Sequence, residues 1–277
     1  MIIRENKVKV DEYSDEFMIK PQDREYNPEE LIFFDLEHYV YKKPKCIGVF
    51  GACEYNPKIK SILVTQYMIE DKDEAIDILY LARDYFMKMK NKGKKAIVTF
   101  SGNNDFTVIN YLFEKNGILY NFDEEFDSID IQKEYEKDRI GSIGLKNLEK
   151  IFDIIREGEV ISGSNLAKTF HKVMKDKSYF KRMPEEKIEK ILLYNEQDVV
   201  NLYYIYVNWK KYIIHNIDEN MIENLDSESV DINVDNENQE ENEENEENDE
   251  IDEVIDDELQ LSQQNKNNSS SQTKELL

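Results

Sequence analysis

Two carboxylates interrupt an apolar segment near the start of the chain. The segment LIFFDLEHYV, residues 31–40, is rich in β-forming residues and contains Asp35 and Glu37. Side chains two residues apart in a strand point to the same face, so these carboxylates would lie side by side. Adjacent anions on a half-buried strand repel each other, and a divalent cation with oxygen ligands is their natural partner. Taken alone, the pair favours a simpler explanation, an amphipathic edge strand with both acids in water.

Two further acids stand where they could join such a site. Asp105 follows the apolar segment AIVTF and the loop SGNN, and it opens a segment with helical spacing. An Asp at this point is often an N-cap, although α/β sheets also bind ligands at the ends of parallel strands. Asp198 lies in the strongly apolar segment LLYNEQDVVNLYYIY, one helical turn after Tyr194 and on the same face. By itself, Asp198 is explained by a solvent-facing stripe at least as well as by a site.

The strand signals around these acids predict a mixed sheet. Three β-rich segments, 31–40, 45–55 and 59–69, are joined by hairpin-length connections, which favours an antiparallel meander. The uninterrupted apolar run in 94–102 is typical of a parallel strand, and 126–135 is a weaker fifth strand. We therefore predict an α/β fold with a mixed five-stranded sheet, three antiparallel strands followed by parallel ones.

Helical spacing of apolar residues separates and follows these strands. Two helices are expected between the strands, and three more follow the last strand. Their ranges are 71–93, 105–117, 144–155, 162–175 and 184–214. The last is long enough to be broken.

The charge of the chain is concentrated near its C-terminal end. The 277 residues carry a formal net charge of −24, but residues 216–277 hold 22 acids and two lysines. We expect this segment to be a disordered acidic tail, because it cannot bury enough apolar surface to offset chain entropy. The predicted organisation is an N-terminal extension at 1–30, one folded domain at 31–215 and the tail at 216–277. The overall charge argues against a basic-patch binder of nucleic acid.

Composition narrows the setting in which the protein works. No stretch reaches the ~18–20 consecutive apolar residues of a membrane helix, and the first residues lack the apolar run of a secretory signal. The two cysteines, Cys46 and Cys53, are too few for a disulfide framework and are expected to be core thiols. These features favour a cytoplasmic protein without a membrane partner.

Read together, the acids form an ordered set: D-x-E in the first strand of the meander, Asp after the fourth predicted strand and Y-x-x-x-D in a late helix. This set resembles the DEDD exonucleases of the ribonuclease-H-like superfamily, in the variant whose third motif carries Tyr. The segments TFSGNNDF, GLKNLE, ISGSN and YNEQDVVNL are similar to those of the YprB-type ribonuclease-H-like domain. The resemblance covers roughly residues 30–209. In two places the chain departs from that pattern: Asp105 and Phe106 stand in interchanged order, and Tyr194 stands where this branch more often carries His.

The resemblance implies a metal-dependent nuclease, specifically a 3′–5′ exonuclease that acts on the end of single-stranded DNA or RNA. In this mechanism two Mg²⁺ or Mn²⁺ ions, about 3.5–4 Å apart, supply the hydroxide nucleophile and stabilise the leaving 3′ oxygen. The implied metal ligands are Asp35, Glu37, Asp105 and Asp198. Tyr194 would orient the attacking water.

Four other residues are candidates for substrate contact. Ser101, Asn103 and Asn104 form a small polar loop, which is equally well explained as a strand-to-helix turn. Lys146 in GLKNLE would meet a phosphate, although an ordinary helix-surface lysine is the simpler reading. Two other functions stay open: a ribonuclease-H-like binding or scaffold module without turnover, favoured by the altered second motif, and an acidic tail that contacts a basic protein partner.

Overall fold

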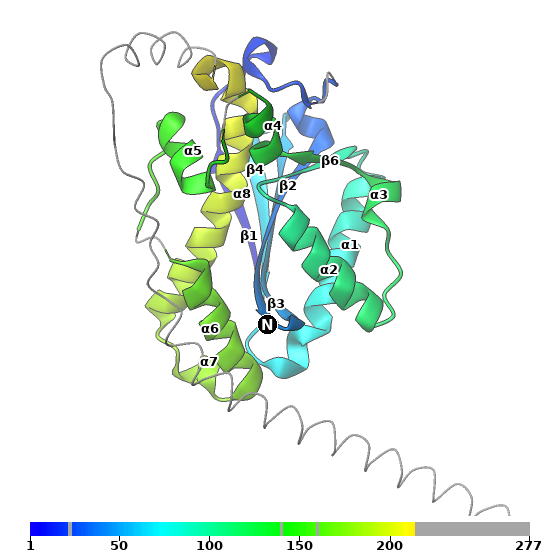
Figure 1. Cartoon of the computed structure of the whole chain (residues 1–277), viewed down its shortest axis with the longest axis vertical. Coiled ribbons are helices and arrows are strands. Elements are labelled where there is room, and N and C mark those ends of the chain that lie inside the picture. The colour runs from blue at the N-terminus through cyan, green and yellow to red at the C-terminus, as the bar shows by residue number, and fades with distance from the viewer. Residues whose placement is uncertain (22–23, 139–140, 159–160, 214–277) are drawn as a thin grey trace, which may run out of the picture. The chain divides into compact units, whose positions relative to one another are not determined.

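The computed structural model describes residues 1–21, 24–138, 141–158 and 161–213, so the predicted acidic tail at 216–277 lies outside the described residues. Within them the chain forms one six-stranded sheet in the order β1-β4-β3-β2-β5-β6 (Figure 1). The strands are β1 (Ile2–Lys9), β2 (Leu31–Tyr41), β3 (Lys43–Asn56), β4 (Ser61–Met68), β5 (Ala96–Thr99) and β6 (Asp127–Asp130). The predicted α/β class is confirmed.

The directions of the strands follow the prediction, and their number does not. β2, β3 and β4 pair antiparallel, whereas β5 and β6 continue the sheet parallel to β2. The extra strand is β1, which pairs with β4 along its whole length, inside the segment expected to be a mere extension. Its sequence IIRENKVK hides the strand because half of its residues are charged, as is common on edge strands, which must discourage pairing with other chains.

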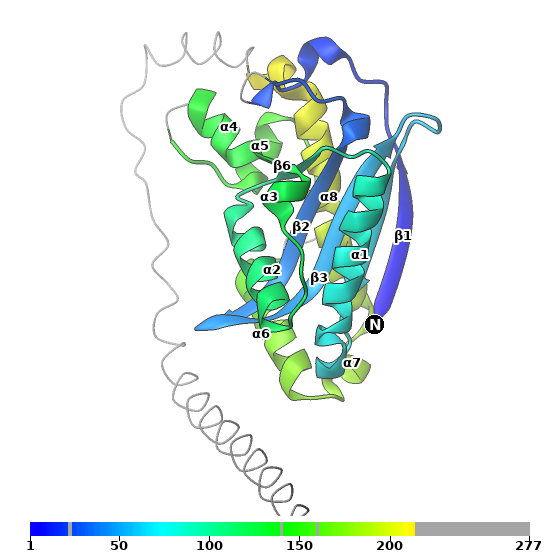
Figure 2. The same cartoon turned by 90° about the vertical axis from the view of Figure 1, so that its right-hand side faces the viewer.

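Helices cover both faces of the sheet. Figure 2 shows α1 (Asp77–Asn91) and α2 (Asn103–Lys115) in front of the sheet and α8 (Glu185–Ile213) behind it. The long helix α8 runs unbroken for 29 residues and contacts β2, β3 and β4. The remaining helices are α3 (Phe122–Glu125), α4 (Ile131–Asp138), α5 (Leu145–Ile151), α6 (Gly163–Lys175) and α7 (Tyr179–Arg182), with 3₁₀ turns at Asp15–Phe17, Pro28–Glu30 and Lys72–Ala75. Among the described residues, no helix has the length and apolarity to cross a membrane.

The strand predicted at 126–135 is wrong for more than half of its residues. Only Asp127–Asp130 of the segment 126–135 form a strand, β6, and the chain then turns into α4. The side chain of Asp130 explains the change, since its Oδ1 accepts a 3.0 Å hydrogen bond from the backbone N–H of Gln132 and so caps the first turn.

Strand β2 divides the core into two layers. Phe33 faces α8 and makes edge contacts with Tyr203 and Tyr206, at ring-centroid distances of 5.6 and 6.0 Å. Phe34 faces the opposite way and packs on Phe86 of α1, 5.2 Å away. Because alternate residues share a face, this alternation continues into the next residues of β2 and turns the side chains of 35 and 37 toward α8.

The packing predicts which aromatic residue anchors α8. Phe33→Ala removes a fully buried ring from between β2 and α8, so we expect the free energy of unfolding to fall by about 3–5 kcal/mol. Ile3→Ala in β1 is the control, because Ile3 is 60% exposed and its loss should change stability by less than about 0.5 kcal/mol. Urea unfolding of the two variants measures both values, and equal effects would contradict this account of the core.

Candidate metal centre

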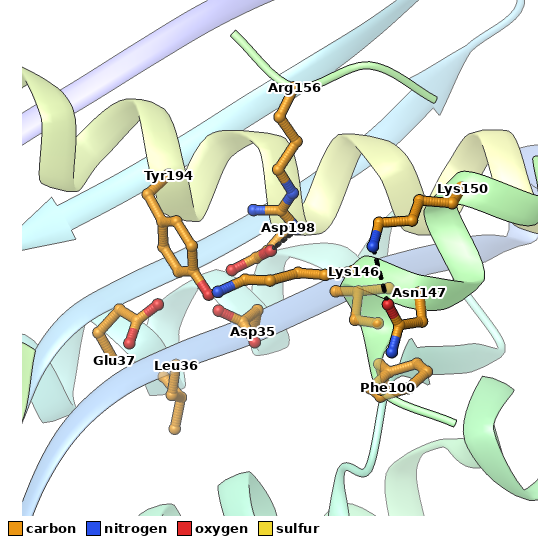
Figure 3. A pocket seen from close by; sticks show the side chains of 12 residues that line it. Asp35, Leu36, Glu37, Phe100, Lys146, Asn147, Lys150, Arg156, Tyr194 and Asp198 are labelled. Atoms are coloured by element: carbon orange, nitrogen blue, oxygen red, sulfur yellow. Dashed lines mark hydrogen bonds and ion pairs between the residues drawn. The ribbon is translucent and has the colours of Figure 1, made fainter. Parts of the chain in front are cut away.

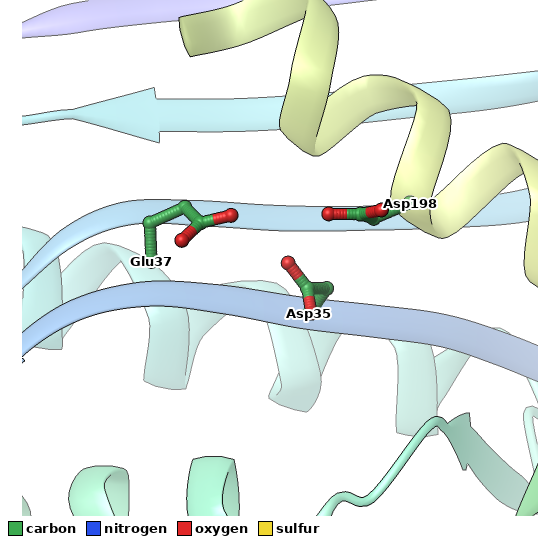
Figure 4. A group of neighbouring side chains, drawn as sticks. All are labelled: Asp35, Glu37 and Asp198. Atoms are coloured by element: carbon green, nitrogen blue, oxygen red, sulfur yellow. The ribbon is translucent and has the colours of Figure 1, made fainter. Parts of the chain in front are cut away.

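Three carboxylates converge between β2 and α8. Asp35 and Glu37 extend from β2 and Asp198 from α8, and one oxygen of each lies within 4.8 Å of the others (Figure 4). Glu37 and Asp198 are buried, and Asp35 is partly buried. Oxygen ligands in this number and spacing suit a hard divalent cation. The solvent-facing explanations of the D-x-E pair and of Asp198 are therefore wrong.

A row of side chains across the sheet holds Asp35 in place. Asp35 lies opposite Gly51 of β3, which in turn lies opposite Gln66 of β4. The missing side chain of Gly51 leaves a space that the buried amide of Asn195 fills. Asn195 Nδ2 donates to Asp35 Oδ2 over 3.1 Å, and its Oδ1 accepts from Gln66 Nε2 over 2.9 Å. The orientation of this Asp35 carboxylate therefore depends on α8 and β4 together.

Asp105 approaches the same group from the other side of β2. The parallel partner β5 pairs only with Leu31–Phe33, so the edge of β2 beyond that point is open. Asp105, in the first turn of α2, is buried and accepts a hydrogen bond from the backbone N–H of Leu36 at this open edge. Its carboxylate is not one of the three that lie within 4.8 Å of one another, and the helix begins at Asn103 with Gly102 as its N-cap.

The four carboxylates destabilise one another's charged forms. Burial raises the pKa of Asp35 to about 6 and, with repulsion from Asp35, raises that of Asp198 to about 8. Burial and neighbouring carboxylates also hold the pKa of Glu37 and of Asp105 well above the ordinary range. A bound cation would reverse these shifts by favouring the ionised forms. The donor set therefore fits a divalent metal chemically as well as geometrically.

A cleft of about 580 Å³ opens over these carboxylates (Figure 3). Lys146 and Lys150 of α5 line it, and so do Tyr194, Arg156 and Phe100. The Nζ of Lys146 lies 5.3 Å from the centre of the Tyr194 ring and donates to the backbone carbonyl of Ile161 over 3.3 Å. Acidic residues thus form one part of the cleft and lysines another, a charge arrangement that suits a phosphate ester bound beside metal ions.

The comparison with known families agrees with this architecture. The family model described as RNase_H superfamily matches residues 32–210, which include all of the converging acids. The chain belongs to the RNase H superfamily. Among curated proteins, no significant match is found. The predicted superfamily is confirmed, and the narrower DEDD, Tyr-variant and YprB-type assignment stays a prediction.

Tyr194 lies beside the carboxylates of this RNase H-like site. It is partly buried, lines the cleft and stands one turn before Asp198 on α8. Burial, and then the charge of Asp198, raises the pKa of Tyr194 above its usual value. Its hydroxyl therefore stays protonated at neutral pH, which suits a hydrogen-bond donor or a water-orienting group and does not suit a general base.

The predicted polar loop lies apart from this cleft. Ser101 has a positive φ of 55° and donates its N–H to Asp130 over 2.9 Å, and Asn104 is exposed. Asn103 accepts from Lys133 over 3.1 Å and lines a neighbouring cleft that also contains Asp130. None of the three lines the cleft over the carboxylates, whereas Lys146 does. Their roles in substrate binding stay predictions.

Sequence reasoning did not single out the residues that support the acids. Asn195 and Gln66 fix Asp35, while Arg156 pairs with Asp198 and with the buried Glu149. Only Glu149 carried a usable signal, as an acid among the apolar residues of GLKNLEKIF. The others are ordinary polar residues in the sequence, and their role depends on contacts between distant segments.

Repulsion among the carboxylates should make the stability of the metal-free protein depend on pH. A carboxyl group whose folded pKa is raised stabilises the fold at low pH and loses that contribution as the pH rises through the folded pKa. Glu37→Gln removes one of the repelling anions, so the variant should melt several degrees above the wild type without metal at pH 8. This gain should shrink toward pH 4, where the unfolded chain is also protonated. Thermal unfolding in chelator at both pH values measures it.

The matched control is Glu189→Gln, which removes an exposed carboxylate that is paired with Arg4. Its pKa is lowered by that ion pair, so its loss should destabilise the fold slightly, by less than about 1 kcal/mol. A lower melting temperature for Glu37→Gln than for the wild type at pH 8 would show that the carboxylates do not repel one another as inferred.

Gly51 provides a second test of the site. A Cβ at this position would lie 2.0 Å from Asn195 Oδ1, so Gly51→Ala must displace the amide that orients Asp35. We expect the stabilisation by Mn²⁺ to need about 10-fold more metal, as for other residues that support metal ligands. Gly163→Ala is the control, because a Cβ there meets nothing within 4 Å. A wild-type response to Mn²⁺ in Gly51→Ala would refute the role of Asn195.

Proposed function

We propose that this RNase H-like protein is a metal-dependent nuclease, specifically a 3′–5′ exonuclease that hydrolyses phosphodiester bonds at the end of single-stranded DNA or RNA. The observation that carries the proposal is the convergence of Asp35, Glu37 and Asp198 within 4.8 Å in a cleft that lysines line. Superfamily membership supports a nuclease, since hydrolysis of nucleic acids by carboxylate-bound metal ions is the activity that the resemblance implies.

In this proposal the carboxylates hold two ions, Mg²⁺ or Mn²⁺. The charge of Asp35 raises the pKa of both Glu37 and Asp105, so Asp35 would be the ligand best placed to serve both ions. The ions would activate the attacking water and stabilise the leaving oxygen. Asp105 would hold the second ion directly or through water, because its carboxylate stands outside the closest group.

The remaining groups of the cleft act on the substrate. Tyr194, protonated and adjacent to Asp198, would hydrogen-bond and orient the attacking water. Lys146 and Lys150 would contact the phosphates of the strand on the α5 side of the cleft. The lysines neutralise backbone charge without reading sequence, as is usual for contacts to phosphates.

A single-stranded end is the substrate that the resemblance to DEDD exonucleases implies. The cleft over the carboxylates, about 580 Å³, lies within the ~300–1,000 Å³ range of small-ligand pockets. One or a few nucleotides would therefore fit beside the proposed ions.

A second candidate function is a nucleic-acid-binding or scaffold module with weak or absent turnover. Two observations favour it: the second motif carries Asp and Phe in interchanged order, and Asp105 lies outside the closest group of carboxylates. A second ion would then be held weakly. The two candidates differ in one measurable respect, cleavage by a protein that binds both metal and nucleic acid.

The test is a cleavage assay on end-labelled oligonucleotides of single- and double-stranded DNA and RNA, with Mn²⁺, Mg²⁺ or chelator. We expect metal-dependent shortening of the single strand. A 3′ label should be released at once as a mononucleotide, and a 5′ label should give a descending ladder. Asp35→Asn and Asp198→Asn should lower the rate at least 100-fold, because each removes a ligand charge.

Asp84→Asn is the matched control, since Asp84 is exposed and pairs with Arg83 on α1; its activity should equal that of the wild type. Binding of the oligonucleotide without any cleavage, in folded protein that responds to Mn²⁺, would support the binding module instead. Release of the 5′ label first would contradict the proposed polarity.

A further inference from the structure

Arg156 is a buried cation that contacts both a proposed metal ligand, Asp198, and a second buried carboxylate, Glu149. The side chain of Arg156 is 8% exposed and lies in the connection between α5 and α6. Nε and Nη2 donate to the two oxygens of Glu149 over 2.7 and 2.6 Å, a bidentate pair. Nη2 also donates to Asp198 Oδ1. The guanidinium carbon lies 5.1 Å from the centre of the Tyr194 ring.

Glu149 holds this guanidinium and offsets part of its charge. Glu149 is 1% exposed, and its Oε1 also accepts a 2.8 Å hydrogen bond from Asn201 Nδ2. The planar fork of Arg is matched to a carboxylate, so the pair fixes the plane of the guanidinium. Glu149 offsets part of the charge of Arg156, and the guanidinium acts on Asp198 both through its remaining charge and as an oriented donor.

The bond from Arg156 engages one of the two oxygens of Asp198 and brings a positive charge beside it. Figure 3 shows one Asp198 oxygen joined to Arg156, and Figure 4 shows an oxygen of Asp198 turned toward Glu37 and Asp35. A cation held by both oxygens would have to share Oδ1 with the positively charged guanidinium. The arrangement therefore favours binding of a cation through the other oxygen of Asp198.

We propose that Arg156, fixed by Glu149, is a positioning residue that limits Asp198 to one ligand oxygen and so makes the site select Mg²⁺ or Mn²⁺ over Ca²⁺. The proposal rests on the metal site of the proposed function. Ca²⁺ takes 6–8 oxygen ligands and commonly uses carboxylates with both oxygens, whereas Mg²⁺ demands near-octahedral geometry with single oxygens and water. A carboxylate with one free oxygen meets the second requirement and not the first.

The test compares two cations on a variant that keeps the fold. Arg156→Met alone would leave Glu149 charged and buried, which costs several kcal/mol. The variant Glu149→Gln with Arg156→Met removes both charges and keeps an acceptor for Asn201. Calorimetric titration and thermal unfolding with Mn²⁺ and with Ca²⁺ give the two dissociation constants without any cleavage assay.

In the wild type we expect Mn²⁺ to bind more tightly than Ca²⁺. In the double variant the ratio of the Ca²⁺ and Mn²⁺ dissociation constants should fall by about tenfold, because Asp198 regains its second oxygen while it loses its orientation. The matched control, Arg4→Met with Glu189→Gln, removes an exposed bidentate pair with bonds of 2.9 and 2.6 Å. Its ratio should equal that of the wild type.

An unchanged ratio in the folded double variant would overturn the proposal, since Arg156 would then act only on stability. Failure of the proposed function looks different. In that case Mn²⁺ would stabilise the wild type no more than it stabilises Glu37→Gln, or the wild type would bind Mn²⁺ with the expected preference over Ca²⁺ and still cleave nothing.

Discussion

The structure is organised around carboxylates that are kept close together and away from water. Burial raises the pKa values of all four carboxyl groups, and repulsion from neighbouring carboxylates adds to the effect at Glu37, Asp105 and Asp198, so the site opposes folding in the absence of a cation. The surroundings must be rigid enough to prevent the acids from relaxing into solvent. The aromatic contacts of Phe33 with Tyr203 and Tyr206 supply that rigidity, because they lock α8 onto β2 on the same sheet face as the acids.

Two local features of β2 bring the carboxylates together within this rigid core. The short partner β5 leaves the edge of β2 open beyond Phe33, and Asp105 reaches the N–H of Leu36 there. The pairing of β2 with β3 shifts register between Glu37 and His38, a bulge of the kind that re-aims side chains next to functional sites. The acids thus gather where regular sheet pairing ends, and two different elements have access to them.

The sequence predicts the parts of this arrangement that depend on local pattern. The apolar alternation of β2, the antiparallel meander and the late helix carry the acids, and the ordered motifs connect them to the superfamily. It did not predict β1, whose charged residues mask its strand period, or the turn at Asp130, where a side-chain cap overrides the β-rich composition. A sequence pattern reports on one element at a time. Pairing with β4 makes β1 a strand, and one hydrogen bond of Asp130 ends β6, so neither outcome is visible in the pattern of the segment itself.

The residues that support the acids could not be predicted from the sequence for a different reason. Arg156 and Asp198 are 42 residues apart, and Asn195 and Asp35 are 160 apart. No spacing rule connects them, since each contact exists only after the sheet and α8 have packed. Gly51 illustrates the point, because its lack of a side chain has no evident purpose until Asn195 fills the space above it.

The net charge of the whole chain likewise differs from the charge around the site. The formal charge of −24 comes mostly from residues 216–277, and it says little about a cleft in which the carboxylates of β2 and α8 lie near Lys146 and Lys150. Fields between exposed charges fade over about 8 Å at physiological salt. Beside the cleft one guanidinium, that of Arg156, is shared by Glu149 and Asp198. Asp35, Glu37 and Asp198 still keep oxygens within 4.8 Å of one another, and that excess of negative charge is the physical basis for assigning cations to this position.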